Sequence, residues 1–266
     1  MSKKPFVSIV VASFNRDEII RKSLKSLLNQ NYPNDSFEII FFDNNSTDKT
    51  NEIVKNLTYQ YPNVNIVIKN HNKNYGSSGT YKRAINYLNN KWEYILKIDE
   101  DVILKNNTLS ELVKTADKAA IKGFVGGKIL YFDNKKIIQA IGSFLRPYFS
   151  IAKGISVNEE LTNHQIKNIK RIDGVNGCMT LISREIYEKV GWFDDNYFIY
   201  YDDHELMYKA NLNGFMNYYN PNAIAYHATK TGSKLKYTNN IWLYYSIRGS
   251  FIFLRRNFKV SELNYY

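Results

Sequence analysis

The sequence has one cysteine and lacks any long apolar run. Cys178 stands alone among 266 residues, so a disulfide within the chain is excluded and a reducing setting is expected. The opening residues, MSKKPFVSIVVASF, lack the long apolar segment and small-residue cleavage site of a signal peptide. No stretch reaches the ~18 apolar residues that a transmembrane helix needs, and the nearest, 241–254, is interrupted by Arg248. We therefore expect a cytoplasmic protein that reaches the inner face of the cell membrane only as a peripheral component.

Acidic residues are the minority among the charges. The chain carries 36 Lys and Arg against 25 Asp and Glu, which gives a net charge of +11. Such a surface suits nucleic acid, anionic lipid or phosphate-bearing ligands equally well. Hydrophobic residues make up 44% of the chain, enough for a packed core, and the length fits one large α/β domain with at most a short appendage.

Strand and helix patterns alternate through the first hundred residues. Runs rich in Val and Ile predict strands, and apolar residues at helical spacing, such as Ile20, Leu24 and Leu27, predict helices between them. The predicted strands are 6–14, 37–42, 64–68 and 94–98, and the predicted helices are 17–30, 47–59 and 80–88. This order predicts an α/β fold with a doubly wound, mostly parallel sheet flanked by helices.

The second half of the chain is less regular. Its predicted strands are 124–131, 175–182 and 223–227, its predicted helices are 183–190 and 203–212, and 143–170 is predicted as a long loop or lid. Residues 237–258 alternate aromatic with basic residues and predict an amphipathic helix. We expect a domain over 1–230, with halves 1–102 and 103–230, followed by a helical extension over 231–266.

Polar side chains follow three predicted strands, at 13–16, 43–46 and 99–101. In parallel sheets, ligands bind beyond the carboxyl ends of the strands, so these positions are candidates for a site. Asp99 and Asp101 could hold Mg²⁺ or Mn²⁺, which take one or two carboxylates together with substrate phosphates. The same three residues, 99–101, would also be compatible with an acidic turn that is exposed to solvent and binds no metal.

Other segments carry weaker signals. Asp43 could accept hydrogen bonds from a base or ribose, or could cap a turn. The glycine-containing loop 72–79 precedes a predicted helix and could bring backbone N–H groups near phosphate. Three of the four residues 202–205 are acidic. They could simply stabilise the start of a helix, or one of them could serve as a general base. His227 would be a metal ligand only if carboxylates for the same ion lay beside it.

Seven blocks of the chain, in their order and spacing, form a pattern that is specific for one protein family. Between Val7 and about Arg256 the chain resembles family-2 glycosyltransferases of the GT-A fold, particularly bacterial rhamnosyl- and galactofuranosyltransferase-like members. The blocks are VSIVVASFNR, FFDNNSTDKT, NKNYGSSGTYKRAI, LKIDEDV, VNGCMTLISREIYEKVGWFDDNYFIYYDDHELMYKANLNGF, NPNAIAYH and YYSIRGSFIFLRR. Two of these blocks depart from the family pattern. Asp202-Asp203-His204-Glu205 replaces Glu-Asp-x-Asp, and Gly249 stands where Asn is usual.

The resemblance implies a role for each matching residue. Asp203 would be the catalytic base, with Glu205, Asp202 and Trp192 near the acceptor. Asp101 would be the main metal ligand, joined by Asp99 and His227. The residues on the donor side would be Ser13, Asn15, Arg16, Asp43, Asn74, Gly76, Arg83, Asp99 and Glu100.

The resemblance also implies a reaction and its partners. A sugar would move with inversion from a UDP- or dTDP-sugar to a saccharide or lipid-linked saccharide, with Mn²⁺ or Mg²⁺ as cofactor, in cell-surface polysaccharide synthesis. UDP-galactofuranose, UDP-hexose and dTDP-rhamnose all remain open as donors. The segment 237–258 could contact anionic membrane, pack on the domain, or join copies in a homo-oligomer.

Two other functions compete with this one. A sugar-phosphate nucleotidyltransferase also uses a doubly wound sheet and a carboxylate that binds metal. It usually has a glycine-rich loop after the first strand, whereas residues 13–16 contain no glycine. A nucleic-acid-binding protein would suit the net charge, but acidic clusters at the strand ends would repel phosphates. We therefore expect no nucleic-acid partner.

Overall fold

The computed structural model describes residues 4–146, 150–229 and 240–258. Its main sheet follows the order β10-β7-β6-β12-β4-β1-β2-β3. Off this path, β13 pairs with β6, and β5 and β11 pair with β13. The first four strands along the chain lie together and parallel, as predicted. They are β1 (Val7–Ser13), β2 (Phe37–Asp43), β3 (Asn65–Asn70) and β4 (Tyr94–Asp99).

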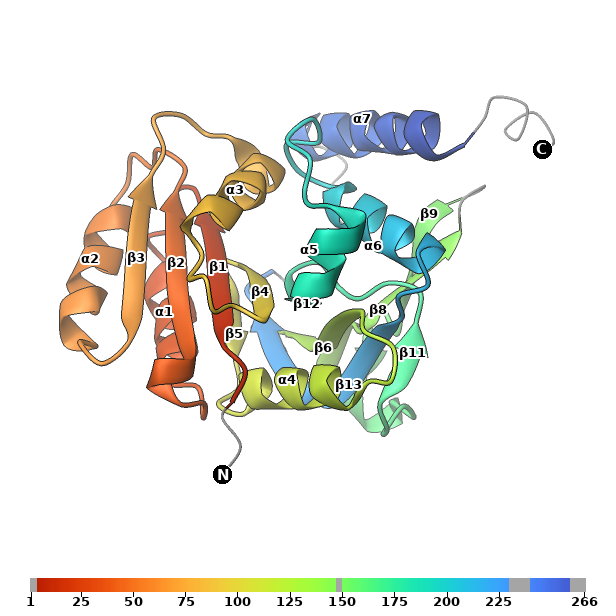
Figure 1. Cartoon of the computed structure of the whole chain (residues 1–266), viewed down its shortest axis with the longest axis horizontal. Coiled ribbons are helices and arrows are strands. Elements are labelled where there is room, and N and C mark those ends of the chain that lie inside the picture. The colour runs from red at the N-terminus through yellow and green to blue at the C-terminus, as the bar shows by residue number, and fades with distance from the viewer. Residues whose placement is uncertain (1–3, 147–149, 230–239, 259–266) are drawn as a thin grey trace.

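Helices cover both faces of this sheet (Figure 1). On one face, α1 (Ile20–Leu28), α2 (Thr50–Gln60) and α4 (Thr108–Lys118) bury their apolar residues in one core. Alternate side chains of β1 and β2, such as Ile9 and Ile39, belong to the same core, and α4 lies over β6 and β13. On the other face lie α3 (Gly76–Ala84), α5 (Arg184–Val190) and α6 (Asp202–Leu212). The alternation of strand side chains between the two cores explains why β1 and β2 are buried throughout.

The second half completes the sheet with antiparallel pairs. β12 (Met179–Ser183) lies between β4 and β6 (Phe124–Tyr131) and is antiparallel to both, whereas β13 (Asn217–His227) runs parallel to β6. The shorter strands are β5 (Val102–Leu104), β7 (Ile137–Ala140), β10 (Glu159–Glu160) and β11 (Lys170–Ile172). The sheet is therefore mostly parallel in its first half and mixed in its second. Single 3₁₀ turns occupy Asn34–Ser36, Ile85–Tyr87 and Leu161–Asn163.

The prediction of a long loop over 143–170 was wrong. This segment contains most of β8 (Gly142–Arg146), which pairs with β9 (Ser150–Ile155) as a separate two-stranded sheet, and it also contains β10. These strands are short, and their composition lacks a clean alternation of apolar and polar residues, so pairing rather than pattern defines them. The prediction also missed β5 and α4, and it began β13 six residues late.

Helix α3 begins at Gly76, four residues before the predicted start at Thr80. The residues expected to form a glycine loop are thus its first turn. Gly76 has φ +72°, and an added Cβ would lie 2.2 Å from the carbonyl oxygen of Phe198. The backbone N–H of Gly76 donates to Asn74 Oδ1 at 2.8 Å. Glycine here therefore permits both the turn and the close approach of a distant segment.

The C-terminal helix α7 (Asn240–Asn257) lies across α6, on the side of the sheet that carries α3, α5 and α6 (Figure 1). The first residues of the predicted helix, 237–239, lie outside the described residues. Phe253 is buried, and its ring lies 5.3 Å from that of Tyr208. Among the described residues, no helix combines the length and apolar character needed to cross a bilayer.

Glu205 joins α6 to α7. It is 4% exposed, and its carboxylate lies 3.4 Å from Arg256 Nη1 and 3.2 Å from Lys209 Nζ. Asn257 Nδ2 donates to the same carboxylate at 3.3 Å. Glu205 therefore holds the C-terminal helix in place.

We predict that Glu205→Ala lowers the free energy of unfolding by about 1–3 kcal/mol, because it leaves the groups that met the carboxylate without their partner. Differential scanning calorimetry measures the effect. Glu185→Ala on α5 is the matched control, since its carboxylate lies on the surface and pairs with Lys189 only at 4.0 Å. Equal melting temperatures for the two variants would contradict the anchoring role of Glu205.

Candidate active site

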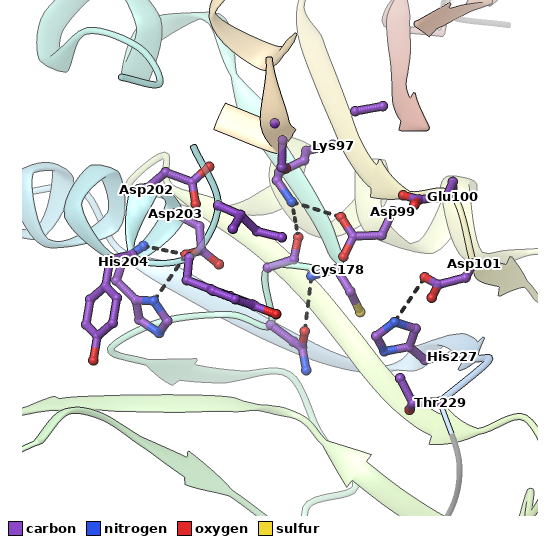
Figure 2. A pocket seen from close by; sticks show the side chains of 18 of the residues that line it. Lys97, Asp99, Glu100, Asp101, Cys178, Asp202, Asp203, His204, His227 and Thr229 are labelled. Atoms are coloured by element: carbon purple, nitrogen blue, oxygen red, sulfur yellow. Dashed lines mark hydrogen bonds and ion pairs between the residues drawn. The ribbon is translucent and has the colours of Figure 1, made fainter. Parts of the chain in front are cut away.

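A cavity of about 860 Å³ opens at the carboxyl ends of β1 and β4. Residues from both halves of the chain line it: Ser13 and Arg16 after β1, Asp99–Asp101 after β4, and Asp202 and Asp203 at the start of α6. Figure 2 shows two groups of carboxylates in this cavity, one around Asp101 and the other at Asp203. The structure thus brings together polar strand ends that lie far apart in the sequence.

The residues predicted on the donor side fall into two sets. Ser13, Arg16, Asn74 and Gly76 line the cavity, together with Asp99 and Glu100. The other three are Asn15, Asp43 and Arg83, which are not among the residues that line it.

Asn15 and Asp43 join neighbouring loops. Asn15 has φ 53°, and its Oδ1 accepts a hydrogen bond from the N–H of Thr47 at 2.8 Å. Asp43 is buried opposite Ser13 in the sheet register and accepts from the N–H of Ser46 at 3.2 Å. Their contacts shape the loops after β1 and β2, which border the cavity.

Arg83, in the last turn of helix α3, and Trp192, which packs against that helix, do not line the cavity. The Arg83 guanidinium lies 3.9 Å from the ring centroid of Tyr75 and 3.4 Å from Asp195. Trp192 Nε1 donates to the carbonyl oxygen of Tyr81 at 2.7 Å. Like Glu205, these two side chains hold elements together and are not among the residues that line the cavity.

The three carboxylates after β4 each have a different cationic partner. Asp101 Oδ1 lies 3.1 Å from His227 Nε2, Glu100 Oε1 accepts from Arg16 Nε at 2.9 Å, and Asp99 Oδ1 accepts from Lys97 Nζ at 3.2 Å. Burial, reinforced by the neighbouring Asp101 and Asp99, raises the pKa of Glu100 to about 7. Burial alone would raise the pKa of Asp101, but the hydrogen bond and charge of His227 outweigh it, and this pKa is lowered.

Asp101 and His227 fit a divalent cation. The carboxylate and imidazole converge from β4 and β13 on the cavity, and oxygen with nitrogen donors suits Mn²⁺ or Mg²⁺ when substrate phosphates complete the shell. Within the described part of the chain, no group of three or more His, Cys, Asp or Glu side chains forms a complete metal cage. Asp99 turns instead toward Lys97.

Asp202 and Asp203 begin α6 and are buried side by side, yet their pKa values move in opposite directions. Burial, followed by the charge of Asp203, raises the pKa of Asp202 to about 6. Burial would also raise the pKa of Asp203, but His204 and Lys97 reverse this and hold it well below its ordinary value. Asp203 Oδ1 lies 3.1 Å from His204 Nδ1 (Figure 2). Asp203 is therefore the member of the pair that ionises first and keeps its charge to lower pH.

The segment before Asp202 has an unusual backbone. Phe198, Tyr200 and Tyr201 all have left-handed φ values, 66°, 66° and 68°. Non-glycine residues rarely adopt this conformation, so surrounding contacts must hold it. The carbonyl oxygen of Phe198 accepts from Ser78 N at 3.1 Å, and the Phe198 ring stacks on Tyr245 of α7 at 4.7 Å. These contacts from α3 and α7 place Asp202 and Asp203 in the cavity.

Sequence reasoning missed Lys97. This residue lies within the apolar strand β4, its side chain is only 6% exposed, and it lines the cavity. Its signal in the sequence was a lysine inside the run YILKID, two positions before Asp99. A lysine in a buried strand needs charged or polar partners, which is the reason to suspect a site.

The chain resembles known proteins in sequence and in fold. The model of the family described as "Glycosyl transferase family 2" matches residues 8–191. Over 109 residues the chain is 33% identical to a beta-monoglucosyldiacylglycerol synthase of Nostoc sp., which covers 41% of the chain and 23% of that protein. Over 114 residues it is 30% identical to the GalNAc(5)-diNAcBac-PP-undecaprenol beta-1,3-glucosyltransferase of Campylobacter jejuni, covering 43% of the chain and 35% of that protein.

A solved structure extends the similarity across the chain. The mannosyltransferase PcManGT of Pyrobaculum calidifontis, in complex with GDP-Man and Mn²⁺, superposes with a TM-score of 0.67 at 18% identity. It covers 97% of this chain and 66% of that one. The α/β fold of the GT-A type that the sequence predicts is confirmed. The chain spans less than half the length of the two curated relatives above.

We predict that Asp202→Asn stabilises the protein at pH 8 and that the gain fades toward pH 4. The folded state raises the pKa of Asp202 from 3.8 to about 6, so it binds the proton more tightly than the unfolded chain does. Ionising this carboxyl as the pH rises through that window therefore costs stability, and asparagine avoids the cost. Melting temperatures across this pH range measure it, with Asp35→Asn on the surface as control. A gain that is equal at pH 4 and pH 8 would contradict the assignment.

Proposed function

The chain belongs to glycosyl transferase family 2, and from this we propose that it moves a sugar, with inversion, from a nucleotide-diphosphate sugar to a hydroxyl of a saccharide or lipid-linked saccharide. The observation that carries the proposal is a single cavity with two differently tuned acidic groups. Asp101 with His227 can hold a cation on one side, and Asp203 stays ionised on the other. Inverting transfer needs these two functions on opposite sides of the reacting carbon.

We assign donor binding to the half of the cavity formed by the first four strands. Ser13, Arg16, Asn74 and Gly76 can touch the nucleotide sugar directly, since they line the cavity. Asn15, Asp43 and Arg83 act from behind by fixing the loops that carry these residues. UDP-, dTDP- and GDP-sugars are all candidates, the last because the similar mannosyltransferase was solved with GDP-Man.

Asp101 and His227 would hold Mn²⁺ or Mg²⁺, and Asp99, two residues before Asp101 and also in the cavity lining, would be a third candidate ligand. When bound, the ion neutralises the charge that develops on the leaving diphosphate. Arg16 and Glu100 support the same side, because their ion pair fixes the strand end that carries Asp101. The Mn²⁺ in the similar mannosyltransferase is consistent with this choice of cofactor.

Asp203 would act as the general base. Its carboxylate oxygen takes the proton of the acceptor hydroxyl as the new bond to the anomeric carbon forms. The hydroxyl becomes acidic only as that bond develops, so an ionised and oriented carboxylate serves well despite its low pKa. Asp202 and the aromatic segment 198–201 would shape the acceptor side, whereas Glu205 and Trp192 support it from outside the cavity.

We propose that α7 rests on an anionic membrane surface that presents a lipid-linked acceptor. Its exposed apolar residues are Ile241, Leu243, Tyr244, Ile247 and Phe251. They recur at helical spacing, and basic residues close the helix at Arg255 and Arg256. The net charge of +11 adds attraction to anionic lipid. The names of the two relatives, which include a diacylglycerol product and an undecaprenol carrier, point to the same setting.

This proposal keeps the division predicted from the sequence. Residues 1–102 would serve the donor, 103–230 the acceptor, and 231–266 the membrane or a second copy of the chain. The setting would be the cytoplasmic face of the cell membrane, in the synthesis of a cell-surface polysaccharide or glycolipid.

We predict that Asp203→Asn lowers turnover by about 10²- to 10⁴-fold while donor affinity stays within about threefold, because general-base catalysis contributes on that scale. Nucleoside diphosphate release from a panel of UDP-, dTDP- and GDP-sugars, with Mn²⁺, Mg²⁺ or EDTA and a saccharide acceptor, measures it. Glu188→Gln on the surface of α5 is the control. Pyrophosphate release, or turnover unaffected by the Asp203 substitution, would overturn the proposed function.

We predict that replacing both Ile247 and Phe251 by serine lowers binding to anionic vesicles by about tenfold or more, because two exposed apolar side chains each contribute about 1–2 kcal/mol on insertion. Co-sedimentation with phosphatidylglycerol-containing vesicles, at low and high salt, measures it. Tyr59→Ser, which removes an exposed aromatic from α2, is the control. Equal, salt-insensitive sedimentation of all three proteins would remove the membrane contact.

A further inference from the structure

Lys97 is a buried cation that the proposed mechanism does not use. It lies on the central strand β4, in register with Val10 of β1 and Thr180 of β12. Its stem follows Ile95 on the face that packs on α3, and its ammonium lies 4.7 Å from the ring centroid of Tyr81. Placing an ammonium in such surroundings is costly, so its partners must offset the loss of water.

Two acceptors meet the ammonium, one toward each side of the cavity. Lys97 Nζ donates to Asp99 Oδ1 at 3.2 Å and to the carbonyl oxygen of Gly177 at 2.7 Å. Figure 2 shows the ammonium between Asp99 and the segment that carries Cys178. The same segment is tied a second time, because Asp99 N donates to the Cys178 carbonyl oxygen at 3.0 Å. Lys97 thus links the donor-side carboxylate to the loop that precedes β12.

That loop in turn sets the position of the base. An added Cβ at Gly177 would lie 1.8 Å from Asp203 Oδ2, so the backbone of Gly177 lies directly against the carboxylate. A shift of the Gly177 peptide would therefore move Asp203 or open space beside it. The positive charge of Lys97 also acts on Asp202 and Asp203 across this contact.

We propose that Lys97 is a positioning residue, which holds Asp99 and the Gly177 peptide at a set separation and so orients Asp203 toward the acceptor hydroxyl. The inference rests on the proposed transferase function, because it assigns Asp203 as the base. Lys97 would act on the base through its two hydrogen-bond acceptors and not on the reacting atoms themselves. Its effect would pass through Gly177, and misplacing a reacting group by about 1 Å can lower a rate by about 10²-fold.

The test compares Lys97→Met with Lys97→Arg and with Lys128→Met. Methionine keeps the stem and removes both hydrogen bonds and the charge, whereas arginine can still donate to both acceptors. Lys128 on β6 is the matched control, since it is also buried in the sheet but is not part of the cavity lining. Steady-state kinetics with the donor found above, and melting temperatures, are measured for each variant.

We expect Lys97→Met to lower kcat by about 10- to 100-fold with less than about a threefold change in donor KM. Lys97→Arg should recover part of the loss, and Lys128→Met should keep the kcat of the unsubstituted protein at a comparable loss of melting temperature. A kcat for Lys97→Met equal to that of the unsubstituted protein would overturn the proposal. So would equal losses in Lys97→Met and Lys128→Met, which would reveal a general effect of removing a buried lysine.

Crystal structures of the unsubstituted protein and Lys97→Met test the positioning without turnover. Displaced Gly177 and Asp203 groups in the variant would support the proposal, and unchanged positions would overturn it. Failure of the proposed function would show separately, as an unsubstituted protein that releases no nucleotide from any donor.

Discussion

Mutual repulsion among buried carboxylates is the constraint around which this molecule is built. Five of them face one cavity at the carboxyl edge of the sheet: Asp99, Glu100, Asp101, Asp202 and Asp203. Each group that remains charged needs a cation or a directed hydrogen bond, because burial disfavours the ionised form. Arg16, Lys97, His204 and His227 supply them, and each comes from a different element. The pairing of these charges determines which elements must meet at this edge.

The position of the antiparallel strand β12 in the sheet allows these elements to come together. It enters the sheet between β4 and β6, so the loop before it arrives at the end of β4, beside Asp99. A strand added to the other edge, beyond β3, would leave this loop far from the carboxylates. The backbone before α6 completes the contact, since left-handed residues at 198, 200 and 201 turn Asp202 and Asp203 inward. Strain in this segment is held by packing from α3 and α7.

The sequence predicted what depends on local pattern and missed what depends on pairing at a distance. Apolar runs predicted β1, β2 and β4 nearly to the residue, because strands buried on both faces are continuous in apolar character. The short strands β8 and β9 were not predicted, because they are defined by their pairing with each other and not by a local pattern. The site followed the same division. The strand-end residues lie where parallel topology requires. Arg83, Trp192 and Glu205 are instead held outside the cavity lining by contacts with distant segments.

Lys97 shows the difference between what the local sequence pattern predicts and what contacts with distant segments determine. Its neighbours Leu96 and Ile98 belong to the core, so the local pattern predicts a strand regardless of what stands between them. A methionine at this position would satisfy the same pattern and avoid the cost of burying an ammonium. The lysine is compatible with the fold only because Asp99 and the Gly177 carbonyl oxygen, 80 residues further along, converge on it. A residue that the strand does not need, held by groups on both sides of the cavity, is best explained by the chemistry at that edge of the sheet.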